Sequence, residues 1–320
     1  MHAASIIMLC WAMIGAACCV SGVGAEAAVL SLGSLVALVG VPHGAADHRF
    51  ARWRLEPLLG RAWVVVFLVG YPAVALLVVL GWVWAPSATI VLFFLASAWH
   101  FGQEEPRLAV GPRLVRPALR FARGGLVIWT PLVFRGDEVI RHLGIVAPRG
   151  LGPDARGILE AATIWSCFML ATAAVAWSMQ GLMAVKAGGW RRRVLLVDNV
   201  MVASLVTLFA VVSPVVGFIV YFCGWHSARG LNRLRRELAE SWPQLARSVA
   251  PLTALAIGLA VAGVCGFFPT GRWNDGVIRA TFLGLSAVAV PHLLLHGVAP
   301  LLAPAGPRAA DRPAHLGITA

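Results

Sequence analysis

Charged residues are scarce in this chain of 320 residues. Asp, Glu, Lys and Arg make up 12% of it, whereas about 25% is typical of soluble domains. Hydrophobic residues make up 59%, and the mean hydropathy is +0.81. Too few charges are present to cover a water-soluble enzyme of this size, and the high apolar content excludes intrinsic disorder. The composition indicates a protein that crosses a membrane several times.

Lysine is almost absent, and acidic residues are few. Of the 26 basic residues only Lys186 is not arginine, and with 14 acidic residues the formal net charge is +12. The basic residues lie in short groups between apolar runs, so we expect them to orient membrane segments and predict no nucleic-acid interface. The six cysteines form no CxxC pair and all lie in apolar runs, which favours packed thiols over a disulfide framework.

Apolar runs of about 20 residues, long enough for a helix to cross a bilayer, recur along the chain. Ten such runs are found, at residues 4–23, 27–43, 63–84, 87–102, 121–135, 158–185, 194–212, 214–228, 249–268 and 277–298. Twenty basic residues fall in loops on one side of the membrane and six on the other, which is a positive-inside pattern. The sequence therefore predicts an all-α, polytopic bundle of about ten transmembrane helices in the cell (inner) membrane, with both termini cytoplasmic.

The chain shows no internal repeat and no separate soluble domain, so we expect a single transmembrane domain over residues 1–320. Residues 1–26 form either an extra N-terminal helix or a signal-like segment. The absence of Lys and Arg near its start favours the helix. Residues 136–157, rich in Gly and Pro, are predicted to form a long outer loop, and residues 299–320 a flexible tail.

Five histidines fall at the predicted cytoplasmic ends of four different helices. They are His43, His100, His226, His292 and His296. Polar side chains at membrane depth are costly and usually face the interior of the bundle. One such histidine is more often an ordinary core residue than a ligand, but four helices that bring imidazole to one depth favour a metal site. Neutral imidazoles suit Fe, Zn, Cu or Ni.

Polar and aromatic residues beside these histidines are candidates for supporting roles. Asp47, four residues after His43, is placed either to orient a ligating imidazole through its second ring nitrogen or to remain an ordinary interfacial carboxylate. Trp99 and Trp225 each precede a candidate histidine and would line a slot for an apolar substrate, or pack as ordinary helix aromatics. Asp198 would either reach the site or begin a helix.

Four short segments occur in a distinctive order: PHGAADH at 42–48, WHFG at 99–102, CGWHSAR at 223–229 and PH at 291–292. They resemble the Brp/Blh family of membrane-bound β-carotene 15,15′-dioxygenases, and the resemblance spans about residues 35–298. It implies an enzyme that uses O₂ and histidine-bound non-haem Fe(II) to split the central double bond of β-carotene, or of a related carotenoid, into retinal. It also implies a functional link to a rhodopsin.

The resemblance carries over to individual residues. The positions that match family iron ligands are His43, His100 and His226. The fourth family ligand falls one helical turn after His226, where this chain has Gly230. Either His292 or His296 supplies the missing imidazole, or water does. The alternative is that the chain is a diverged, non-catalytic carotenoid- or retinal-binding membrane protein.

A membrane di-iron lipid desaturase or hydroxylase is a further alternative, because such enzymes also carry histidines at inner helix ends. They have HxxxH and HxxHH boxes with about eight histidines in all. In this chain only His292 and His296 have the HxxxH spacing, so the pattern favours the carotenoid enzyme.

Overall fold

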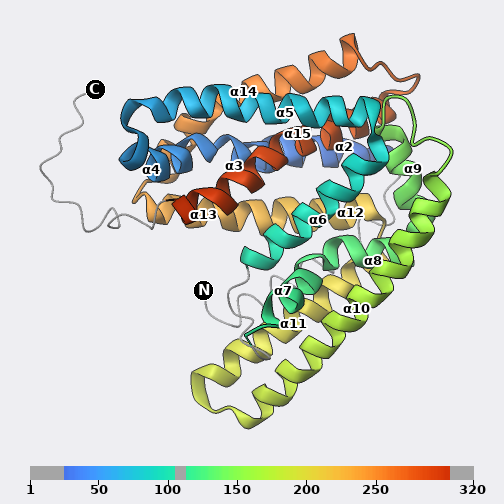
Figure 1. Ribbon diagram of the computed structural model, residues 1–320, viewed down its shortest axis with the longest axis vertical. Helices are drawn as coiled ribbons and strands as arrows, with labels where there is room; N and C mark the ends of the chain where they lie inside the picture. The colour runs from blue at the N-terminus through green and yellow to red at the C-terminus, as the bar shows by residue number, and fades with distance from the viewer. Residues whose placement is uncertain (1–24, 105–112, 303–320) are drawn as a thin grey trace, which may run out of the picture.

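The computed structural model of the chain describes residues 25–104 and 113–302 (Figure 1). Within these ranges every regular element is a helix and no strand occurs, which confirms the predicted all-α class. The predicted run at 4–23 lies outside the described residues, as do most of the segments predicted at 1–26 and 299–320.

The helices follow the apolar runs of the sequence. In chain order they are α2 (Ala25–Leu35), the π-helix η1 (Val36–Gly40), α3 (Val41–Ala45), α4 (Asp47–Leu59), the short 3-10 helix η2 (Gly60–Ala62), α5 (Trp63–Trp84), α6 (Pro86–Glu104), α7 (Arg116–Gly124), α8 (Leu126–Phe134), α9 (Gly136–Val146), α10 (Ala155–Lys186), α11 (Gly189–Val211), α12 (Pro214–Ile219), the π-helix η3 (Val220–Ser227), α13 (Ala228–Glu237), α14 (Trp242–Gly266) and α15 (Trp273–Leu302). Two of the chain reversals occur at residues suited to a turn or to the start of a helix. Gly60 adopts a φ of 54°, and Ser241 caps α14 in a reciprocal pair with Gln244.

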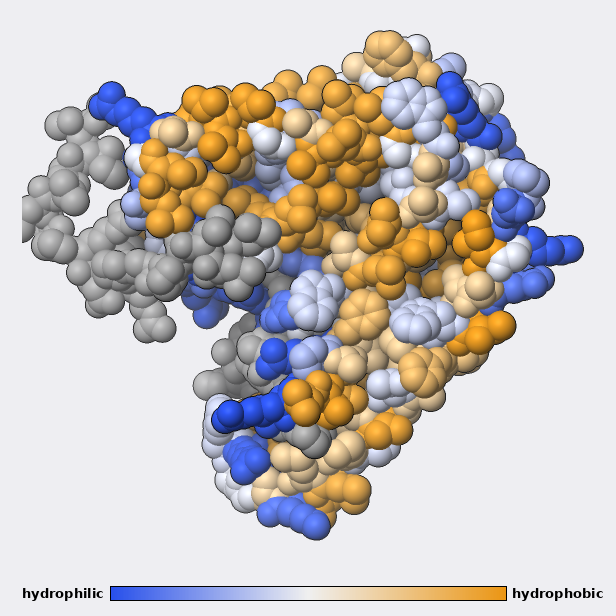
Figure 2. Space-filling view, viewed as in Figure 1, coloured by the Kyte–Doolittle hydropathy of each residue, from blue (hydrophilic) through white to orange (hydrophobic). Residues whose placement is uncertain are grey.

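Five helical stretches of the described residues are long and apolar enough to cross a membrane. They are Glu26–Trp84, which includes the turn at η2, and Ala155–Lys186, Gly189–Val211, Trp242–Gly266 and Trp273–Gly297. On the face of the molecule shown in Figure 2, apolar residues gather over the upper helices, and hydrophilic residues are concentrated at the right-hand edge and the lower tip. The molecule is therefore a membrane-type helix bundle. The number of stretches is below the predicted ten partly because some runs are divided, as at Gly125 between α7 and α8.

The helices form two groups (Figure 1). In the first, α15 packs against α2, α5, α9 and α14; in the second, α10 packs against α7, α8 and α11. Helix α6 joins the groups, because it contacts α5 and α15 on one side and α7 and α8 on the other. The candidate histidines lie on α15, on α3, which packs against α14 of the first group, on η3 and on α6, so the site lies near the junction of the two groups.

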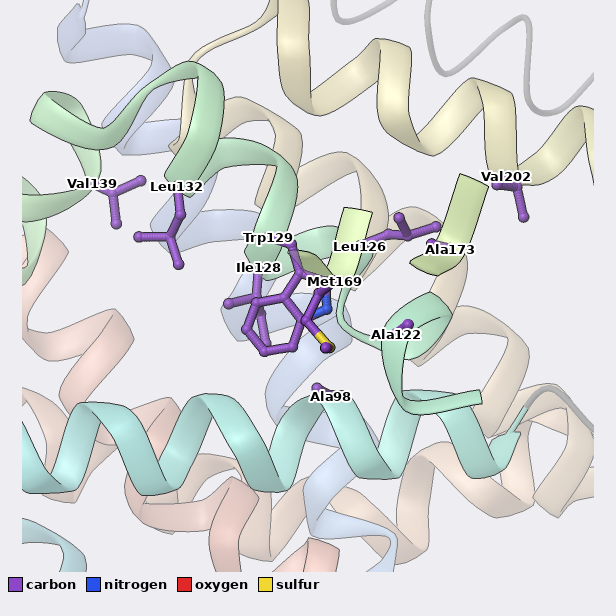
Figure 3. Packing of buried hydrophobic residues seen from close by; sticks show 10 residues of the cluster. All are labelled: Ala98, Ala122, Leu126, Ile128, Trp129, Leu132, Val139, Met169, Ala173 and Val202. Atoms are coloured by element: carbon purple, nitrogen blue, oxygen red, sulfur yellow. The ribbon is translucent and has the colours of Figure 1, made fainter. Parts of the chain in front are cut away.

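The second group has an apolar core between α6, α7, α8, α10 and α11 (Figure 3). Trp129 fills its centre and is packed with Met169, and Ala98 and Ala122 are fully buried. Helices α6 and α7 cross there at backbone contact. A Cβ on Gly102 would lie 2.8 Å from the carbonyl carbon of Arg120, so only glycine permits this approach. The crossing lies half a turn from His100 and fixes the end of α6.

The prediction of an outer loop at 136–157 is wrong for the first half of that segment. Residues Gly136–Val146 form helix α9, which begins with Asp137 and Glu138 in its first turn, where acidic side chains are favourable. Its apolar residues bury against α8 and α15. The glycine content hid this helix, because glycines are tolerated where tertiary packing supplies the stabilisation.

Candidate metal centre

Four imidazole rings from four elements meet at the junction of the two helix groups. The ring of His43, from α3, has its centroid 5.0 Å from that of His226 in η3 and 4.9 Å from that of His292 in α15. His100, from α6, lies 5.7 Å from His226 and 5.2 Å from His292. The predicted convergence of four helices is therefore present in the structure.

Three of these rings have the spacing of a metal site. One ligand nitrogen from each of His43, His226 and His292 lies within 4.8 Å of the others, and two of the three residues are buried. Neutral imidazoles are suitable ligands for iron. The triplet contains no carboxylate, so its ligand atoms are all histidine nitrogens. The donor set thus fits the Fe(II) that the sequence led us to expect, with His100 as the neighbouring fourth ring.

Asp47 is buried, at 1% exposure, beside this triplet. Its carboxylate accepts hydrogen bonds from Nδ1 of His292 at 2.8 Å and from the hydroxyl of Tyr71 at 2.8 Å. A histidine that donates through Nδ1 presents Nε2 to a metal, and a carboxylate partner fixes that tautomer. The imidazole that Asp47 contacts most closely is that of His292, and its role in orienting a ligating imidazole stays a prediction.

His296 lies on the outer side of this network. Its Nε2 donates to Asp47 at 3.2 Å, and its ring stacks on Phe50 with centroids 4.0 Å apart. His296 and His292 also form, with Asp47, a second group close enough to hold a metal. His296 thus contacts Asp47 and also lies against the ring of His292, with centroids 4.2 Å apart.

Gly230, at the position where the family pattern has a fourth ligand, packs against His43. A Cβ at residue 230 would lie 2.8 Å from Nδ1 of His43 and closer still to its Cε1. The ring of His43 thus uses space that a side chain at residue 230 would take. The ring of His292 lies 4.9 Å from that of His43.

One π-helix precedes His43 and another contains His226. Segment η1 ends at Gly40, three residues before His43, and η3 contains His226. A Cβ on Gly40 would lie 2.7 Å from the ring of Phe222, so the two π-helices touch at this glycine. Such wide turns are frequent at functional sites because they rotate side chains out of the α-helical register.

An apolar cavity of about 180 Å³ opens onto the histidine cluster. The four clustered histidines contribute to its wall, and nearly all of the remaining lining is aliphatic or aromatic, from α5, α6, α8, α9, α11, α12, η3 and α15. The aromatic residues are Trp82, Phe93, Phe94, Phe101, Phe209, Phe218, Phe222 and Phe282. An apolar cavity with an imidazole cluster in its wall is suited to a water-insoluble substrate.

The two tryptophans that were candidates for this lining lie elsewhere. Trp99 is 49% exposed on the outer surface of α6, and Phe101 lines the cavity instead. Trp225 is buried in a core cluster with residues of α11, and the guanidinium of Arg229 lies 5.3 Å from its ring centre. Asp198 is also away from the histidines, since its carboxylate pairs with Arg123 at 2.7 Å.

Tyr71 is a site residue that the sequence interpretation did not include. Its hydroxyl joins Asp47 to the carbonyl of Val288 at 2.8 Å. The chain has only two tyrosines, and this one stands in the middle of an apolar run. A lone hydroxyl at that depth needs a buried partner, and this was the signal available in the sequence.

Comparisons with known proteins agree on one family. The model of a family described as beta-carotene 15,15′-dioxygenase matches residues 34–298. A beta-carotene 15,15′-dioxygenase from an uncultured marine bacterium, 66A03, is 23% identical over 265 residues, which is 82% of this chain and 90% of that protein. The probable beta-carotene 15,15′-dioxygenase Blh of Halobacterium salinarum is 27% identical over 248 residues, or 69% of each chain. No solved structure matches the chain.

Proposed function

Because the chain belongs to the β-carotene 15,15′-dioxygenase family, we propose that it is a carotenoid dioxygenase that cleaves the central double bond of β-carotene, or of a close relative, to give retinal. The observation that carries the proposal is the cluster of His43, His100, His226 and His292, the last three of them buried, at the wall of an apolar cavity. The reaction breaks one carbon–carbon double bond and forms two aldehydes, each with one atom of O₂.

The residues that would hold the metal are His43, His226 and His292, with His100 beside them. Bound Fe(II) supplies the open coordination positions and the electrons that O₂ needs in order to react with a hydrocarbon. A site made of neutral imidazoles carries no ligand carboxylate into the apolar cavity. In this arrangement His292 takes the part that the family pattern gives to the position of Gly230.

The remaining residues of the site orient the His292 ring and shield the substrate from water. Asp47 holds the His292 ring in one tautomer and is itself held by Tyr71 and His296. The aromatic and aliphatic wall excludes water from the polyene and aligns it with the histidines. Holding reactants in one geometry is worth several orders of magnitude in rate, and here the rigid helices supply that geometry.

The proposal includes an arrangement of the helices in the membrane. The chain forms a single transmembrane domain of about ten helices in the cell (inner) membrane, with both termini cytoplasmic. The strongly unequal distribution of arginines supports this orientation. A carotenoid dissolves in the hydrocarbon layer, so a cavity between membrane helices gives it access without passage through water. The retinal produced would serve an acceptor in the same membrane, and a rhodopsin is the proposed one.

Expression in a bacterial host that accumulates β-carotene tests the function. The wild-type protein is expected to convert carotene to retinal, and His226→Ala and His292→Ala are expected to lose this activity while still inserting into the membrane. His48→Ala is the matched control, because His48 lies in the same PHGAADH segment as His43 but donates to the carbonyl of Ala45. Unchanged carotene that purifies with iron-free wild-type protein would instead identify a non-catalytic carotenoid-binding protein.

A further inference from the structure

The cavity follows α15 from the histidine cluster toward the other end of the bundle. On α15 its lining runs from His292 through Val288 and Leu285 to Phe282. Ten residues of α-helix separate His292 from Phe282, which corresponds to about 15 Å. This length is close to that of one arm of β-carotene, from its central double bond to the far edge of its ring.

One face of α9 closes the far end of this cavity. The residues of α9 in the lining are Val139, His142, Leu143 and Val146, which have the i, i+3, i+4, i+7 spacing of a single helix face. Helix α9 packs on α15, and its carbonyl at Ile145 accepts from Arg279. Arg279 lies one turn beyond Phe282, so α9 crosses α15 just past the last lining residue of that helix.

Several hydrogen bonds fix α9 in this position. Arg279 donates to the carbonyl of Ile145 at 2.8 Å and to that of Phe268 at 3.0 Å, and so ties α9 to the segment before α15. At the other end Arg135 donates to the carbonyl of Val211 at 2.7 Å and pairs with Glu138 at 3.1 Å. Both ends of α9 are therefore anchored, and the helix forms a rigid wall across the cavity.

The side wall that leads to α9 is a row of aromatic rings. The ring of Phe222 stacks on His226 at 5.6 Å and on Phe218 at 5.0 Å, and Phe218 packs on Phe282 at 5.0 Å. This row connects the histidines with the far end. Outside the four clustered histidines, the polar residues of the lining are Ser97 and His142. A hydrocarbon polyene has no group that hydrogen-bonds to either, so contact with the end wall must set its position along the cavity.

We propose that α9 is the end stop that decides which double bond of the carotenoid reaches the histidine cluster. The inference rests on the proposed function and adds its selectivity. The terminal ring of one carotenoid arm abuts Val139 and Leu143, and the length from this contact to the histidines places the central bond at the site of cleavage. Removing atoms from the cavity face of α9 lets the substrate enter further.

Deeper entry has a defined chemical outcome. The next double bond of the polyene then lies at the histidines, and its cleavage breaks that bond and adds one oxygen atom of O₂ to each carbon. One carbon bears a hydrogen and becomes an aldehyde two carbons longer than retinal. The other bears a methyl group and becomes a ketone two carbons shorter. No other oxidant or reductant is consumed, so only the product lengths change.

The test compares products of Leu143→Ala with those of Ile140→Ala in the carotene-accumulating host. Leucine and isoleucine lose the same atoms on conversion to alanine, and Ile140 is on α9 but does not line the cavity. Val139→Ala is a second, milder variant in case Leu143→Ala fails to accumulate. Extracted pigments are separated by chromatography and identified by mass, and membrane levels of each variant are measured alongside.

We expect Leu143→Ala and Val139→Ala to yield the longer aldehyde and the shorter ketone beside retinal, whereas wild type and Ile140→Ala yield retinal alone. Retinal as the only product of both cavity variants would overturn the end-stop role and leave the proposed function intact. The mixed products in Ile140→Ala as well would also overturn it, because the shift would then not depend on the cavity face. A wild-type protein that forms no retinal contradicts the proposed function itself.

Discussion

Replacement of Gly230 by alanine is expected to weaken metal binding without lowering the stability of the fold. The new Cβ would lie 2.8 Å from Nδ1 of His43 and closer still to Cε1. Nonbonded carbon atoms rest about 3.5–4.0 Å apart, so the His43 ring must move by roughly 1 Å. Metal–ligand distances tolerate only about 0.2 Å, and we therefore expect the variant to bind iron weakly.

The size of the effect on activity follows from that displacement. A misplacement of about 1 Å at a reacting centre lowers rates about 100-fold, whereas alanine stabilises a helix by about 1 kcal/mol relative to glycine. Gly230→Ala is therefore expected to insert and fold like wild type but to form retinal about 100-fold more slowly. The family-like Gly230→His is expected to be defective for the same reason, although it restores the common pattern.

The assay measures iron per chain by mass spectrometry and retinal formation in purified protein. Gly224→Ala is the matched control, because Gly224 lies in the neighbouring π-helix and a Cβ there meets nothing within 4 Å. Wild-type iron content and activity in Gly230→Ala would refute the reasoning, since His43 would then not depend on the space at residue 230. Loss of both in Gly224→Ala would show that any added methyl disturbs this region.

Three further predictions concern the surroundings of the site. Asp47→Ala, which releases His292, is expected to weaken iron binding about 10- to 100-fold; titration with Fe(II) measures this, and unchanged affinity would contradict the orienting role. Gly102→Ala pushes a methyl group into the main chain of α7 and should destabilise the protein by at least about 1–3 kcal/mol, seen as a lower Tm in detergent, whereas Gly144→Ala has open space and should not. Asp198→Ala leaves Arg123 buried without its carboxylate and should cost about 3–5 kcal/mol while sparing the iron site; loss of iron at an unchanged Tm would argue against a structural role.

The family and the histidine cluster could be predicted from the sequence because both depend on short, local patterns. Four segments in a fixed order carried the family resemblance, which the comparisons confirmed. Each candidate histidine was found at the end of an apolar run, and the expectation was that such ends come together. His43, His226 and His292 meet in the structure.

The partners of each site residue could not be predicted, because they depend on the rotation of each helix about its axis. Asp47 lies four residues from His43 in the chain yet contacts His292, and Trp99 points outward although it adjoins His100. The π-helical turns in η1 and η3 change this rotation locally, and the sequence pattern did not predict these turns. Helix α9 was missed for a related reason, since its stability comes from packing and not from its own sequence.

The stoichiometry of the reaction tests the central claim most directly. Purified wild-type protein loaded with Fe(II) is given β-carotene and O₂, and the retinal formed is measured against the β-carotene consumed. The account predicts two molecules of retinal for each β-carotene, because the histidine cluster acts on the central bond alone. A ratio clearly below two, with longer or shorter carbonyl products making up the difference, or no turnover by the iron-loaded protein, would contradict it.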